Sequence, residues 1–154
     1  PMVTEDPSTA KSRSGYVITY HGVPLVWASR LQTVYALSTA EAEYISISTA
    51  LRDVIPMMDL LAEMADKGFQ VQSKPTVHCK LFEDNSGALE QARVAKYRPR
   101  TRHINAAWHH FRSYVVDKLI SILPVDTKSQ LGDVFTKQVS KDDFIRFRKI
   151  IFGW

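Results

Sequence analysis

Two β-rich runs open the patterned part of the chain. Residues 16–20 and 24–28 are rich in aromatic and β-branched side chains, and the dipeptide His21-Gly22 lies between them. Two such runs joined by a pair of turn-forming residues predict a β-hairpin. Pro24 falls at the start of the second run, where its missing N–H is tolerated.

The spacing between apolar residues changes over residues 38–66. Apolar side chains from Ile47 to Leu61 recur at spacings of three and four, which predicts an amphipathic helix. We expect Pro56 to kink or divide this helix, because proline lacks the N–H that continues the helical ladder. We expect Gly68 to close it.

Strand and helix patterns alternate in the rest of the chain. Residues 77–82 and 119–125 have the composition of strands. Four further segments are expected to be helical: 86–93, 104–116, 130–137 and 142–152. The order ββ-α-β-α-α-β-α-α predicts an α/β fold, a mixed sheet flanked by helices.

We interpret residues 1–154 as a single domain, which suits a chain of this length. Within it, residues 1–13 are expected to be the remnant of a loop, 14–137 the core and 138–154 a C-terminal helix region.

Composition excludes two classes of protein. No apolar run approaches the roughly 20 residues that cross a bilayer, and the N-terminal stretch lacks the apolar core of a signal peptide. Cys79 is the one cysteine, so no intramolecular disulfide forms, which fits a reducing compartment.

The chain carries a net charge of +4, which suits a polyanionic partner. Its basic side chains crowd two stretches, residues 93–103 and 137–149. The alternative interpretation of these stretches is ordinary solvated surface.

Two glutamates near the start of the predicted long helix have different expected roles. Ser38 and Glu41 form the S-x-x-E pattern of a capping box, so Glu41 is expected to cap the helix and face solvent. Glu43 falls at the head of the apolar stripe, where a carboxylate costs free energy unless it is paired or binds a metal. The alternative for Glu43 is a partly exposed residue stabilised by the helix dipole.

Two aspartates lie where predicted strands end or helices begin. Asp84 ends the strand VHCKLFED, where it is either a helix N-cap or a reactive group at the carboxyl end of a strand. Asp133 begins a short predicted helix, and the alternative to a reactive role is a simple ion pair with Lys137, four residues on. Grouped carboxylates of this kind favour hard cations such as Mg²⁺ or Mn²⁺, two of which can support phosphodiester hydrolysis.

Four blocks of sequence, in order, resemble motifs of the ribonuclease H domain of copia-type retrotransposon Pol polyproteins. The similarity covers residues 12 to about 148, and the blocks are SRSGYVITYHGVPLVWASRLQTVYALSTAEAEYISI, LFEDNSGAL, RPRTRHINAAWHHFRSYV and LPVDTKSQLGDVFTKQV. The resemblance implies a ribonuclease H-like fold that cuts the RNA strand of RNA–DNA hybrids during reverse transcription.

Individual residues of this chain match functional residues in the motifs of the family. Glu43, Asp84 and Asp133 match catalytic, metal-binding carboxylates of the family. The resemblance therefore implies two Mg²⁺ or Mn²⁺ ions, an adjoining reverse transcriptase domain in the parent polyprotein, and an intracellular, cytoplasmic setting within a virus-like particle.

The chain departs from the family pattern at two places. The family carries a further catalytic aspartate in a strand before the S-x-S-G-Y motif, and nothing here matches it. We expect that first strand to be truncated, which leaves the activity of this fragment in doubt. Asn105 stands where the family usually has aspartate.

Substrate contacts follow from the same resemblance. Recognition of the 2′-OH is expected near Gln32, Ser38, Thr39 and Asn85. Phosphate contacts are expected from Arg30, Arg102, His103 and Lys137. Trp27 and Trp108 are more typical of core residues than of a surface on which bases stack.

Three functions remain open from the sequence. The first is a metal-dependent endoribonuclease, and the second is a non-catalytic nucleic-acid-binding module with the same fold. A more distant third is an integrase-like relative that cleaves DNA; the EAEY helix directly after the hairpin favours ribonuclease H.

Overall fold

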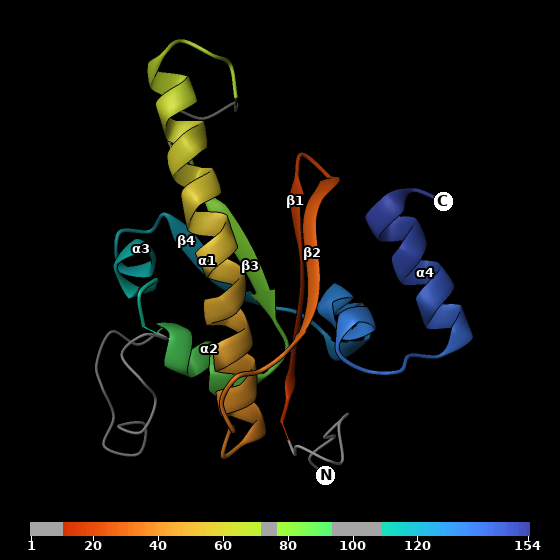
Figure 1. Ribbon diagram of the computed structural model, residues 1–154. Coiled ribbons are helices and arrows are strands. Elements are labelled where there is room, and N and C mark those ends of the chain that lie inside the picture. The colour runs from red at the N-terminus through yellow and green to blue at the C-terminus, as the bar shows by residue number, and fades with distance from the viewer. Residues whose placement is uncertain (1–10, 72–76, 94–108) are drawn as a thin grey trace.

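An antiparallel hairpin begins the fold (Figure 1). The computed structural model describes the chain in three ranges, 11–71, 77–93 and 109–154. Strand β1 comprises Arg13–Tyr20 and strand β2 comprises Val23–Leu31. They are joined by His21 and Gly22, whose φ angles of 50° and 81° give the left-handed turn that a tight hairpin requires. The predicted hairpin is confirmed.

A second pair of strands is parallel. Strand β3 (Cys79–Glu83) pairs with strand β4 (Ile120–Pro124), with Leu81 opposite Ile122. Among the described residues, β1 pairs as a strand only with β2, and β3 only with β4. The prediction of an α/β fold is confirmed, but that of one mixed sheet is wrong for these ranges, because no described strand bridges β1 and β3.

One long helix, α1 (Thr39–Asp66), runs across both sheets (Figure 1). Pro56 lies inside it, exposed, and does not divide it, so the expectation of a divided helix is wrong. Gly68 follows the C-cap with a φ of 87°, which confirms that glycine closes the helix.

The buried face of α1 is the centre of the core. Its Tyr44 and Leu51 are fully buried and belong to one apolar cluster with Phe111, Ile120 and Ile122. On the hairpin side, a smaller cluster brings together Tyr16, Ala28 and Ala50. Both sheets therefore pack on the same helix, as the apolar stripe predicts.

The remaining elements are short. They are α2 (Ser86–Arg93), α3 (Arg112–Val116), the 3₁₀ turns η3 (Thr127–Ser129) and η4 (Leu131–Phe135), and α4 (Lys141–Phe152). In the three described ranges, no helix has the length and apolar character that crossing a bilayer requires.

Two predicted helices differ from the observed elements. The segment 130–137 forms η4 rather than an α-helix; it contains Gly132, a poor helix former, and the Gln130 side chain accepts a hydrogen bond from that glycine's N–H. The described part of the segment 104–116 is helical only from Arg112 onward. In the C-terminal region, α4 is confirmed.

Gly15 allows η4 to approach the hairpin closely. A Cβ at this position would lie 2.5 Å from Thr136 Cγ2 and 2.8 Å from Phe135 Cβ. The Ser29 hydroxyl also donates to the Phe135 carbonyl oxygen at 2.5 Å, which fastens the same segment to β2. Because Gly15 has no side chain, η4 can pack against β1, and this contact fixes the position of Asp133.

Replacing Gly15 with alanine should destabilise the fold by about 1–3 kcal/mol, because the added methyl group overlaps η4. Chemical unfolding followed by circular dichroism measures this change. Thr19→Ala, at an exposed position of β1, is the control and should change the unfolding midpoint little. Equal stability of Gly15→Ala and the unmodified chain would contradict the packing account.

Candidate active site

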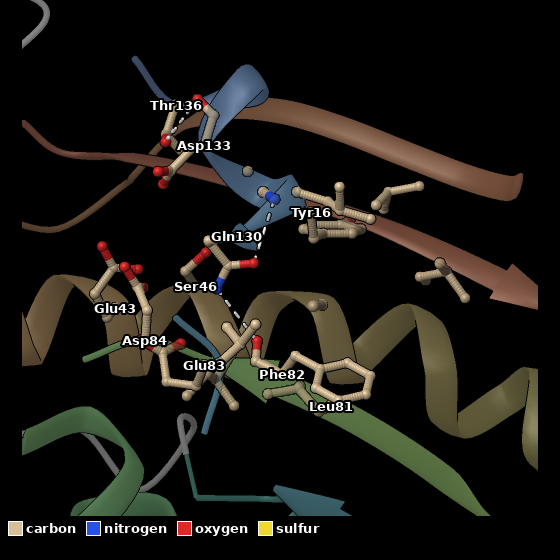
Figure 2. A pocket seen from close by; sticks show the side chains of 18 of the residues that line it. Tyr16, Glu43, Ser46, Leu81, Phe82, Glu83, Asp84, Gln130, Asp133 and Thr136 are labelled. Atoms are coloured by element: carbon tan, nitrogen blue, oxygen red, sulfur yellow. Dashed lines mark hydrogen bonds between the residues drawn. The ribbon is translucent and has the colours of Figure 1, made fainter. Parts of the chain in front are cut away.

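A cleft of about 430 Å³ lies between the two sheets (Figure 2). Its lining includes residues of β1 and β3 on opposite sides, with α1 and η4 completing the walls. The side chains of Glu43, Asp84 and Asp133 line this cleft from α1, the residue after β3, and η4. Residues far apart in the sequence therefore meet at one place.

Glu43 lies in the second turn of α1, facing the cleft. Burial raises its pKa to about 7, and repulsion from Asp84 and Asp133 adds to the rise, while Lys137 opposes it. A carboxyl with this environment exchanges its proton near neutral pH.

Glu41 has the capping role but not the predicted exposure. Its backbone N–H donates to the Ser38 hydroxyl at 3.1 Å, and its Oε2 accepts from the Leu37 N–H at 2.9 Å. The residue is only 7% exposed, so the expectation that it faces solvent is wrong. The carboxylate is buried because it folds back over the helix start.

Asp84 directly follows β3. It does not cap α2, which was the alternative interpretation of this residue. Asn85 fills that role, since its Oδ1 accepts from the N–H groups of Gly87 at 3.0 Å and Ala88 at 3.1 Å. Asp84 is partly buried at the cleft, between the strand and the cap. Its carboxylate is therefore not explained by capping.

Glu83 is a fourth carboxylate of the cleft, which the sequence interpretation missed. It is 5% exposed, and its Oε1 accepts from the Asn85 N–H at 2.9 Å. Burial raises its pKa to about 8 against that hydrogen bond, and the other three carboxylates add to the rise. A signal was present, because alternation in β3 puts Glu83 on the inward side with Cys79 and Leu81.

Asp133 reaches the cleft from η4. Lys137 Nζ lies 2.8 Å from its Oδ2, so the ion pair that was the alternative interpretation of Asp133 is present, and the carboxylate lines the cleft as well. Burial raises the pKa of Asp133, the Lys137 ammonium opposes this, and Asp84 reinforces it.

The predicted substrate-contact residues have varied placements. Gln32 is buried, and its Nε2 donates to Ser14 Oγ at 3.0 Å and to the Ala42 carbonyl oxygen at 2.8 Å, which ties the hairpin to the start of α1. The exposed members are Arg30, Ser38, Thr39 and Lys137, and Asn85 caps α2. Arg102 and His103 lie outside the described residues, as do Asn105 and Trp108.

Carboxylate oxygens are the donors that Mg²⁺ and Mn²⁺ prefer. Nevertheless, within the ranges that the structure describes, no three His, Cys, Asp or Glu side chains are placed to hold one ion together. The donor chemistry of the cleft suits a hard cation, whereas the arrangement of these side chains alone does not enclose one.

The chain is similar to segments of transposon polyproteins. It is 31% identical over 146 residues to the "Retrovirus-related Pol polyprotein from transposon TNT 1-94" of Nicotiana tabacum, a match that covers 95% of the chain and 10% of that relative. Identity is 29% to the corresponding polyproteins from transposons RE2 and RE1 of Arabidopsis thaliana, over 91% and 88% of the chain and 9% of each relative.

These relatives confirm the resemblance to retrotransposon Pol polyproteins. The chain spans about a tenth of their length. No protein-family profile matches it, and no solved structure matches it.

The raised pKa of Glu83 predicts how stability depends on pH. In the folded state this carboxyl keeps its proton up to about pH 8, whereas its ordinary pKa is 4.5, so folding becomes less favourable as pH rises between those values. Glu83→Gln keeps an oxygen acceptor for Asn85 but has no proton to lose. Without divalent cations, its free energy of unfolding should therefore exceed that of the unmodified chain increasingly from about pH 5 to about pH 9.

Exposed Glu63 on α1 provides the matched control, and Glu63→Gln should show no such pH-dependent difference. Denaturant titrations at several pH values provide the measurement. A stability difference between Glu83→Gln and the unmodified chain that stays constant with pH would mean that folding does not raise the pKa of Glu83.

Proposed function

We propose that this chain, a homologue of one segment of transposon Pol polyproteins, is a ribonuclease H domain whose complete form cuts the RNA strand of RNA–DNA hybrids. The observation that carries the proposal is that Glu43, Asp84 and Asp133 line one cleft from three parts of the chain (Figure 2). These are the positions that match the family's carboxylates. Burial and, in addition, repulsion between these carboxylates in the cleft raise the pKa of Glu43 and of Asp133. Bound cations would relieve this repulsion and would in turn attract a phosphodiester.

Two Mg²⁺ or Mn²⁺ ions are the proposed cofactors, held by these carboxylates together with a further ligand. When bound, such ions supply Lewis-acid stabilisation for phosphodiester hydrolysis. The described side chains do not enclose an ion, so the further ligand has to come from outside the described residues.

We propose that the further ligand lies on an additional strand that fills the cleft. The cleft is bordered by β1 and β3, each of which has one strand partner among the described residues. Backbone groups along an unpaired strand edge gain hydrogen bonds from an inserted strand. A strand here would join the two sheets into one mixed sheet and bring its side chains beside Glu43 and Asp84.

The proposed partners follow from this role. They are the RNA–DNA hybrid and an adjoining reverse transcriptase domain of the parent polyprotein, within an intracellular particle. The charge of +4 supports a polyanionic substrate.

A non-catalytic nucleic-acid-binding module is the second candidate. It is favoured by the absence, in the described ranges, of three acidic or metal-ligating side chains placed around one ion. The two candidates differ in whether adding the proposed strand creates cleavage.

The proposal predicts that the present chain shows little or no Mg²⁺-dependent cleavage of a labelled RNA–DNA hybrid, and that a version extended upstream by the first strand cleaves it. In the extended version, Asp84→Asn should abolish cleavage while hybrid binding is retained, because the change removes a carboxylate with little change of shape. Asp142→Asn, in the first turn of α4, is the control and should cleave normally. An RNA–RNA duplex should not be cut.

Two results would contradict this proposal. Equal cleavage by the present chain and the extended one would show that the site is already complete. Failure of a folded extended version to cleave would favour the non-catalytic module.

Hybrid binding should also weaken steeply as salt rises from about 50 to about 300 mM, because each phosphate contact releases counterions. Arg30→Ala should reduce the slope of log affinity against log salt by about one. Lys67→Ala, an exposed substitution after the far end of α1, should leave the slope unchanged. A flat salt response would identify the basic stretches as ordinary surface.

A further inference from the structure

Three aromatic side chains form an exposed cluster away from the cleft. Trp27 of β2 packs edge-on against Phe152 of α4 with ring centroids 5.6 Å apart, and Trp154 lies 6.4 Å from Phe152. Trp27 is 53% exposed and Trp154 is 69% exposed. The sequence interpretation of Trp27 as a core residue is therefore wrong. Two large indoles left open on one face form an exposed apolar patch of the kind that marks an interaction site.

A guanidinium is stacked on this aromatic cluster. Arg148 lies over the Trp154 ring, 5.1 Å from its centroid, and its Nε donates to the Trp154 carbonyl oxygen at 2.9 Å. Helix α4 carries four basic and two acidic side chains, a net charge of +2. The cluster is thus apolar and aromatic, with positive charge at its edge.

The packing of α4 and its C-terminal turn hold the aromatic cluster in place. Phe147 and Ile151, on the inner side of α4, are 2% and 3% exposed. Gly153 then takes a φ of 81° and donates its N–H to the Lys149 carbonyl oxygen, which turns Trp154 back toward the helix. Figure 1 shows α4 beside β2, on the side of the hairpin away from α1.

We propose that the aromatic cluster binds unpaired bases of single-stranded nucleic acid. Bases stack on the indole faces, and Arg148 and Lys149 interact with the phosphates that join them. Exposed aromatic rings combined with cations are how sequence-tolerant single-strand sites are built. The inference goes beyond the proposed function, since none of the cluster residues lines the cleft.

The positive charge beside the aromatic cluster favours single-stranded nucleic acid over a protein surface as the ligand. An apolar partner that covered the aromatic cluster would desolvate the Arg148 guanidinium, which is costly unless a counter-charge is supplied. A second copy would bring two helices of net charge +2 together. A single strand supplies both stacking surfaces and negative charge.

Fluorescence anisotropy with labelled oligo-dT and oligo-U of about 12 nucleotides tests the proposal. The chain should bind both, and Trp154→Ala should weaken binding roughly tenfold, as expected for loss of one stacking surface. Arg148→Ala should also weaken it. Phe144→Ala removes an aromatic side chain from the same helix, 48% exposed, and should leave affinity unchanged. Circular dichroism verifies that each variant is folded.

The outcomes separate this site from the cleft. Retained binding of blunt RNA–DNA hybrid by Trp154→Ala, with lost single-strand binding, supports two distinct sites whatever the fate of the cleavage proposal. Equal effects of Trp154→Ala and Phe144→Ala, or no single-strand binding by the folded chain, would overturn the inference. Self-association in sedimentation that Trp154→Ala abolishes would replace the single strand with a second copy.

Discussion

The packing of α1 against both sheets is the contact on which the described fold depends. The hairpin and the parallel pair share no hydrogen-bonded strand within the described ranges, so they are joined mainly through this helix. Tyr44 and Leu51 bury one stretch of it against the β4 side, and Ala50 faces Tyr16 and Ala28 of the hairpin. The Tyr16 hydroxyl, which donates to the Asp53 carboxylate, adds a polar link between β1 and α1.

This arrangement has a consequence for the chemistry of the cleft. Glu43 belongs to the same stripe of α1 that makes the core, so the packing that stabilises the helix also directs a carboxylate inward. Gly15 then lets η4 deliver Asp133, and the Asn85 cap leaves Asp84 at the end of β3. Burial disfavours the charged forms of Glu43 and Glu83, and repulsion between the carboxylates adds to this, so the pKa of each is raised.

Periodicity predicted the local elements well because their causes are local. The bounds of α2, the turn at His21-Gly22 and the closing role of Gly68 follow from turn and capping residues that act over a few positions. Periodicity did not predict the separation of the two sheets, because strand pairing is a long-range property that local patterns do not contain. Only the expected truncation of the first strand, which came from the resemblance, pointed to a gap in the sheet. Trp27 was misjudged for a similar reason, since nothing local indicates that its face of β2 remains uncovered.

The site was predicted in part. Separating Glu41 from Glu43 was possible because the capping pattern assigns one of them a backbone role. Glu83 was not predicted, although the alternation of β3 already placed it inward, because Asp84 next to it is the residue that ends the strand pattern and matches the family motif. Its burial depends on packing between elements that are far apart in the sequence, which local patterns do not contain.

The convergence of the carboxylates is tested most directly by a carboxyl ¹³C NMR titration of Glu43. The account predicts a midpoint of about 7, which falls when Asp84 or Asp133 is changed to asparagine, because each contributes repulsion. Asp142→Asn on α4 should leave it unchanged. A midpoint near the ordinary value of 4.5, or one that Asp84→Asn does not move, would contradict the placement of these side chains around one cleft.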